Sequence, residues 1–152
     1  MLQLFEGIDL TPESAVWMAG GMRSLAACDG FHMAELALID EFERGLGLPP
    51  SDGDDFDARS CPFDSTEARE VFVRSVQLMS LADGRRSSLE EEWINRTCAC
   101  LNISDERKAE LEREAKKFLL SSLAGVTAFR SQAVGIGESL GLSAADIDEV
   151  LG

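Results

Sequence analysis

Apolar residues recur every three or four positions along most of the chain, which is the spacing of one buried helix face. The most regular run lies in the C-terminal third and comprises Val126, Phe129, Ala133, Ile136 and Leu140. Similar runs occur after residue 35 and after residue 88. No segment shows strand-like alternation, and no Asn-Gly hairpin signal is present. The pattern predicts an all-α fold, a compact bundle of about seven helices.

Polar residues and glycines mark the expected helix ends. Thr11 followed by Pro12 is typical of a helix start, and Ser87 with Glu90 three residues later forms a capping-box pattern. Gly47 and Asn102 suit the left-handed position that often ends a helix. The pair Gly20-Gly21 inside the first predicted helix indicates either a weak point, costing about 1 kcal/mol per glycine, or a close approach of two helices.

The predicted helices form an internal repeat. Residues 25–35 contain an apolar helix end, the corner Asp29-Gly30 and an acid, Glu35, at the next helix start; residues 79–90 repeat this order with Asp83-Gly84 and Glu90. The exits also match, because Leu46-Gly47-Leu48 aligns with Leu101-Asn102-Ile103, and Leu140-Gly141-Leu142 is a third, fainter echo. We interpret the match as a duplicated helical hairpin.

The repeat defines the expected organisation of a single domain over residues 1–152. Repeat one covers about 12–48 and repeat two about 66–103, joined by an acidic loop at 49–65 and followed by C-terminal helices at 104–152. The loop fails as an EF-hand starting at Asp52, because Phe56 and Phe63 occupy positions that require oxygen ligands. We therefore expect a solvated connection between the two repeats.

The net charge of the chain limits the kinds of partner that it is expected to bind. The 152 residues carry a formal net charge of −14, and residues 1–65 contribute three bases against thirteen acids. Nucleic acids and anionic membrane surfaces require a basic face, so we expect neither as a partner. Cations, other proteins or a second copy of the chain remain the expected partners. A solvated acidic surface is the simpler explanation of the charge.

Other sequence features predict a cellular location and contain no motif of a known catalytic site. No apolar run approaches the roughly 20 residues of a membrane span, and the N-terminus lacks a signal-peptide pattern, so we expect a cytoplasmic protein without direct membrane insertion. The four cysteines do not form a zinc-finger spacing and are expected to be reduced. No nucleophile elbow or phosphate-binding glycine loop occurs. We therefore expect no enzymatic activity.

The two Asp-Gly corners, the glutamates that follow them and the Leu-Gly-Leu exits resemble the tellurite-resistance TerB family and TerB-like domains, over residues 18–142. The resemblance implies a compact helical domain of two pseudo-repeated lobes. It also implies a role in tellurite, metal or stress response. Carried onto this sequence, the acids implied to bind metal are Asp29, Glu35, Asp83 and Glu90. Arg85-Arg86, which follows the second corner, departs from this pattern and would weaken cation binding there.

Three hypotheses follow for these acids. In the first, they bind a hard divalent cation such as Ca²⁺, Mg²⁺ or Mn²⁺, for which carboxylate oxygens are suitable ligands. In the second, they are ordinary helix caps in a structural protein-interaction domain. In the third, a remote alternative, they serve a small helical hydrolase. The first requires the two corners to face each other.

Overall fold

The computed structural model describes residues 10–28, 30, 33–49, 53–81, 86–124 and 130–152. No strand occurs in these ranges, which confirms the all-α prediction. The described residues form one 3₁₀ turn, η2, and seven α-helices: α1 (Pro12–Ala27), α2 (Met33–Gly45), η2 (Ala58–Ser60), α3 (Thr66–Ser80), α4 (Ser88–Cys100), α5 (Asp105–Ala124), α6 (Arg130–Ser139) and α7 (Ala144–Leu151).

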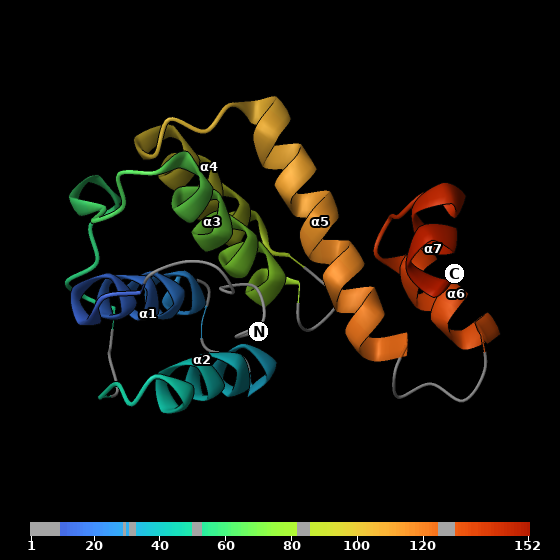
Figure 1. Cartoon of the computed structure of the whole chain (residues 1–152), viewed down its shortest axis with the longest axis horizontal. Helices are drawn as coiled ribbons and strands as arrows, with labels where there is room; N and C mark the ends of the chain where they lie inside the picture. Colours follow the sequence, from blue (N-terminus) through green and yellow to red (C-terminus); the bar gives the residue numbers. More distant parts are fainter. Residues whose placement is uncertain (1–9, 29, 31–32, 50–52, 82–85, 125–129) are drawn as a thin grey trace.

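The helices are arranged along the long axis of the molecule (Figure 1). Helices α1 and α2 lie at one end, α6 and α7 lie at the other, and α5 runs obliquely between the central helices and the C-terminal pair. Helix α3 contacts α1, α2, α4 and α5, and its packing against α5 is the most extensive between any two of the described helices. Helices α6 and α7 pack against α5 and against each other.

Two separate hydrophobic clusters stabilise this arrangement. The main core contains residues of α1 to α5, and its largest fully buried side chains include Met18, Met22, Phe42, Phe72 and Ile94. The second core is small and joins the end of α5 to α6 and α7; its buried members are Leu120, Leu140, Leu142 and Ile147. Helix α5 therefore contributes to both cores, because its earlier residue Leu111 is a fully buried member of the main core.

The loop between the two predicted repeats is not simply a solvated connection. Its acids Asp54 and Asp55 are exposed, as expected, but Phe63 is only 7% exposed and Phe56 packs against the core. The Phe56 ring lies 5.0 Å from Trp17 and 5.6 Å from Trp93, centroid to centroid. The expectation was wrong for these phenylalanines, because aromatic burial outweighs the solvation of the neighbouring acids.

The described helix starts agree with the capping pattern. Thr11 accepts a hydrogen bond from the backbone N–H of Ser14, and Pro12 is the first residue of α1. Ser65 caps α3, because its side chain accepts a hydrogen bond from the backbone N–H of Ala68. Glu43 of α2 is only 4% exposed, because it pairs with Arg23 of α1.

Three helices end with the same backbone geometry. The N–H groups of Leu48, Ile103 and Leu142 donate to carbonyls five residues earlier, at 2.8, 2.9 and 3.0 Å. The residue before each one has a positive φ: 67° at Gly47, 59° at Asn102 and 80° at Gly141. These are Schellman caps. The shared exit pattern in the sequence therefore corresponds to a shared structure.

Candidate functional site

Two of the four predicted site residues, Asp29 and Asp83, lie outside the described residues. The other two occupy equivalent places, since Glu35 is the third residue of α2 and Glu90 is the third residue of α4. Both are buried, with exposed fractions of 0% for Glu35 and 2% for Glu90. Acids in a first helical turn are usually solvated, so burial at both equivalent positions is a distinctive property of this pair.

Glu90 takes part in a complete capping box. The Ser87 Oγ accepts a hydrogen bond from the backbone N–H of Glu90 at 3.1 Å, and the Glu90 Oε1 accepts one from the backbone N–H of Ser87 at 3.0 Å. This confirms the capping pattern predicted from the sequence. The second carboxylate oxygen, Oε2, is buried and accepts no hydrogen bond from the described part of the chain. The capping role therefore uses only half of the carboxylate.

The described residues do not gather into a larger ligand set. Among them, no group of three or more His, Cys, Asp or Glu side chains has an arrangement that could hold a metal ion. Glu35 and Glu90 thus occupy equivalent helical positions. Neither forms a three-ligand metal site with two other side chains of the described residues. Whether the two corners face each other depends on Asp29 and Asp83, which lie outside the described residues.

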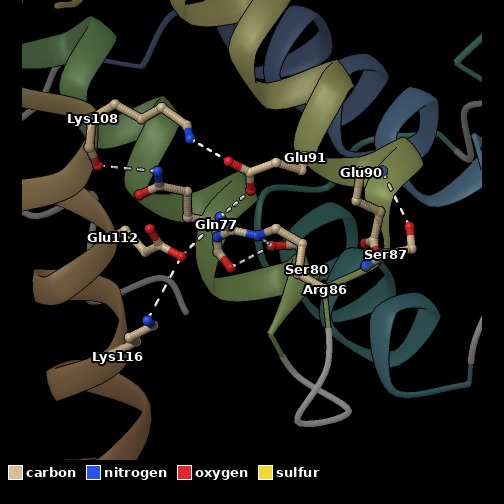
Figure 2. Close-up of polar contacts among 9 residues, drawn as sticks. All are labelled: Gln77, Ser80, Arg86, Ser87, Glu90, Glu91, Lys108, Glu112 and Lys116. Carbon is tan, nitrogen blue, oxygen red and sulfur yellow. Dashed lines mark hydrogen bonds and ion pairs between the residues drawn. The ribbon is translucent and has the colours of Figure 1, made fainter. Parts of the chain in front are cut away.

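Beside Glu90 lies a polar network centred on Arg86 (Figure 2). Only 7% of the Arg86 side chain is exposed. Its Nε donates to the Ser80 Oγ at 3.0 Å, and its Nη1 lies 2.9 Å from a carboxylate oxygen of both Glu91 and Glu112. Arg86 therefore joins the end of α3, the start of α4 and the middle of α5.

Two further residues extend this network. The Lys108 Nζ lies 2.6 Å from the Glu91 Oε1, and the Gln77 side-chain amide donates to the Lys108 carbonyl at 3.2 Å. Burial alone would raise the pKa of Glu91, but hydrogen bonds from Lys108 and Arg86 outweigh it, and the pKa lies below its ordinary value. Glu91 therefore stays ionised at neutral pH and balances the two bases.

No local sequence pattern predicts this network. Ser80 and Glu112 lie 6 and 26 residues from Arg86, so the contacts exist only because α3, α4 and α5 pack together. In Figure 2 the Arg86 side chain extends toward α5, while the Glu90 side chain turns toward Ser87. The guanidinium charge is thus matched by acids other than Glu90.

Comparisons with protein-family models, curated proteins and solved structures gave no significant match. None of the helices in the described part of the chain is both long and apolar enough to cross a bilayer.

Proposed function

We propose that the chain is a non-enzymatic module similar to the TerB family, which acts in tellurite, metal or stress response and binds a divalent cation at its two Asp-Gly corners. Asp29 and Glu35 would supply oxygen ligands from the first corner, and Asp83 and Glu90 from the second. Ca²⁺, Mg²⁺ and Mn²⁺ are the suitable ions, because all three prefer oxygen ligands.

The observation that carries this proposal is that the buried Glu90 Oε2 accepts no hydrogen bond from the described part of the chain. A buried acceptor without a donor costs about 1–3 kcal/mol, and a charged one costs more. A cation bound at this oxygen would remove that cost while leaving the Oε1 in its hydrogen bond to Ser87. Burial of Glu35 at the equivalent position of α2 supports the same role for the first corner.

The position of Arg86 removes one objection to a cation at the second corner. A free guanidinium next to the site would repel a divalent ion. The Arg86 Nη1 instead lies 2.9 Å from oxygens of both Glu91 and Glu112, which neutralise its charge. Repulsion at Glu90 is correspondingly reduced.

The decisive variant is Glu90→Gln. Glutamine retains an oxygen that can accept the Ser87 hydrogen bond, since Gln also forms capping boxes, but it removes the negative charge. We expect Mn²⁺ at 100 times its dissociation constant to stabilise the wild type by about 2.7 kcal/mol. For a domain of this size the melting temperature should rise by about 5–11 °C. E90Q should lose most of this rise without becoming less stable in the absence of metal.

Glu67→Gln is the matched control, because Glu67 is an exposed acid in the first turn of α3. E67Q should respond to Mn²⁺ as the wild type does. A second arm combines Asp29→Asn with Asp83→Asn and follows the amide signals broadened by Mn²⁺ in NMR spectra. A wild type that shows neither a melting shift nor localised broadening would refute the cation site.

A second candidate function is a structural protein-interaction domain in which the acids only cap helices. The Ser87–Glu90 capping box favours it directly. This alternative predicts no metal response in the wild type and a loss of roughly 0.5–2 kcal/mol when Ser87 is replaced by Ala. E90Q therefore separates the two functions, because it preserves the cap and changes only the charge.

A further inference from the structure

A cavity of about 270 Å³ lies between α1 and the loop that precedes α3. Helix α1 contributes Glu13, Val16, Trp17 and Gly20, which fall on one face because they are spaced by three, one and three residues. The facing loop contributes Gly53, Asp55 and Phe56. None of these residues belongs to the proposed cation site.

The lining combines aromatic rings with acids. The Trp17 and Phe56 rings are both partly exposed, and their centroids lie 5.0 Å apart at 49°. The Trp17 indole N–H donates to the Asp57 carbonyl at 3.0 Å, so its one polar atom is satisfied and the ring is held in place. Glu13 and Asp55 are exposed lining residues. In the described part of the chain, neither forms an ion pair with a base.

A cavity lined by aromatic rings and acids favours a cation whose charged group is flat and weakly hydrated. Positive charge is attracted to aromatic faces, most strongly to that of Trp, and arginine both stacks on such rings and pairs with carboxylates. The cavity volume lies just below the range of about 300–1,000 Å³ that accommodates drug-sized ligands, so it suits a single side chain. The net charge of −10 over residues 1–65 would also attract a basic segment.

We propose that the cavity between α1 and residues 53–56 binds one arginine side chain of a partner polypeptide. The guanidinium packs against the Trp17 and Phe56 rings, and Glu13 and Asp55 balance its charge. The arginine is an anchor in a basic segment that runs over the acidic surface of the first repeat.

Gly20 provides a test that does not damage the fold. A Cβ at this position would lie 3.9 Å from the Phe56 Cβ, an ordinary contact, so Gly20→Ala places a methyl group at the cavity without a clash. Alanine also favours the helix. Gly135→Ala is the matched control, because Gly135 lies in α6 with open space around it.

The experiment is an NMR titration of the full chain at low salt with the peptide acetyl-Gly-Ser-Arg-Ser-Gly-amide. We expect focused shifts at the Trp17 indole N–H and at the amides of Gly20, Gly53 and Phe56. The same peptide with neutral citrulline should bind far more weakly. G20A should weaken binding at least about fivefold, because one misplaced methyl group disrupts a fitted pocket. The pair Glu13→Gln and Asp55→Asn should weaken it about three- to tenfold.

Several results would overturn the proposal. Equal binding of the arginine and citrulline peptides would show that charge is not recognised. Unchanged affinity in G20A, or an equal loss in G135A, would place the peptide elsewhere. Shifts spread evenly over acidic residues would indicate non-specific attraction. Free arginine that binds more tightly than the peptide would assign the cavity to a small molecule instead of a polypeptide.

Discussion

Adjacent glycines in α1 should respond differently to the same substitution. A Cβ added at Gly21 would lie 2.6 and 2.9 Å from the Cζ and Cε1 atoms of Phe72, and 3.0 Å from Phe56. At Gly20 the nearest atom would be the Phe56 Cβ, at 3.9 Å. Gly21 is therefore the point at which α1 closely approaches α3, whereas Gly20 is not.

The magnitude follows from two terms. Replacing glycine by alanine inside a helix contributes about 1 kcal/mol of stability at either position. Overpacking against a buried ring costs about 1–3 kcal/mol, and the Phe72 side chain is fully buried. The helix term cancels when the two variants are compared, so Gly21→Ala should be less stable than Gly20→Ala by about 1–3 kcal/mol. Relative to the wild type, G20A should be more stable by about 1 kcal/mol.

Urea and thermal unfolding followed by circular dichroism would measure this difference. For a chain of this length it corresponds to melting temperatures about 2–12 °C apart. Phe72→Leu provides the companion variant, because a smaller side chain leaves room for the new methyl group. Its cost should be lower in the G21A background than in the wild type, with a coupling of about 0.5–3 kcal/mol.

Equal stability of G20A and G21A would refute the reasoning, because the close approach to Phe72 would then have no energetic consequence. Additive effects of G21A and F72L would refute it as well, because they would show that the two positions do not compete for the same space.

Two further predictions concern titratable groups. The Arg113 Nε donates to both carboxylate oxygens of Asp146, at 3.0 and 2.9 Å, and these contacts lower the pKa of Asp146 to about 2, below the unfolded value of about 3.9. The stability that these contacts give the folded state should be complete above about pH 4 and should be lost as the pH falls toward 2. The midpoint of urea unfolding should therefore fall less steeply between pH 4 and pH 2 for Asp146→Asn than for the wild type. Burial raises the pKa of the Cys98 thiol to about 11, whereas Cys100 is exposed. At pH 8 a maleimide should modify the exposed Cys100 faster than the partly buried Cys28 and Cys61, and Cys98 only after unfolding; Cys100→Ser should remove the fastest phase.

Much of the fold could be predicted because helix ends depend on local chemistry. The Ser87–Glu90 box and the left-handed Asn102 are formed by residues three to five positions apart, and the sequence displays them directly. The packing of Phe56 and Phe63 could not be predicted in this way. Their acidic neighbours indicated a solvated loop, and their aromatic partners lie on helices that only the tertiary structure brings near.

The candidate site was predictable to a smaller extent. Sequence alignment of the two repeats gave Glu35 and Glu90 as equivalent positions, and both are third residues of their helices. Their burial was not visible, because it depends on how neighbouring helices cover the first turn. The burial of Arg86 was hidden for the same reason, since its partner Glu112 comes from another helix.

The boundary between two regions that can unfold separately lies within helix α5, because this one continuous helix contributes to both hydrophobic cores. Leu111 is buried in the main core, whereas Leu120 belongs to the small core formed with α6 and α7. No described residue of α6 or α7 belongs to the main core. The C-terminal pair can therefore open, and the last turns of α5 can fray with it, while α1 to α4 and the first part of α5 remain folded.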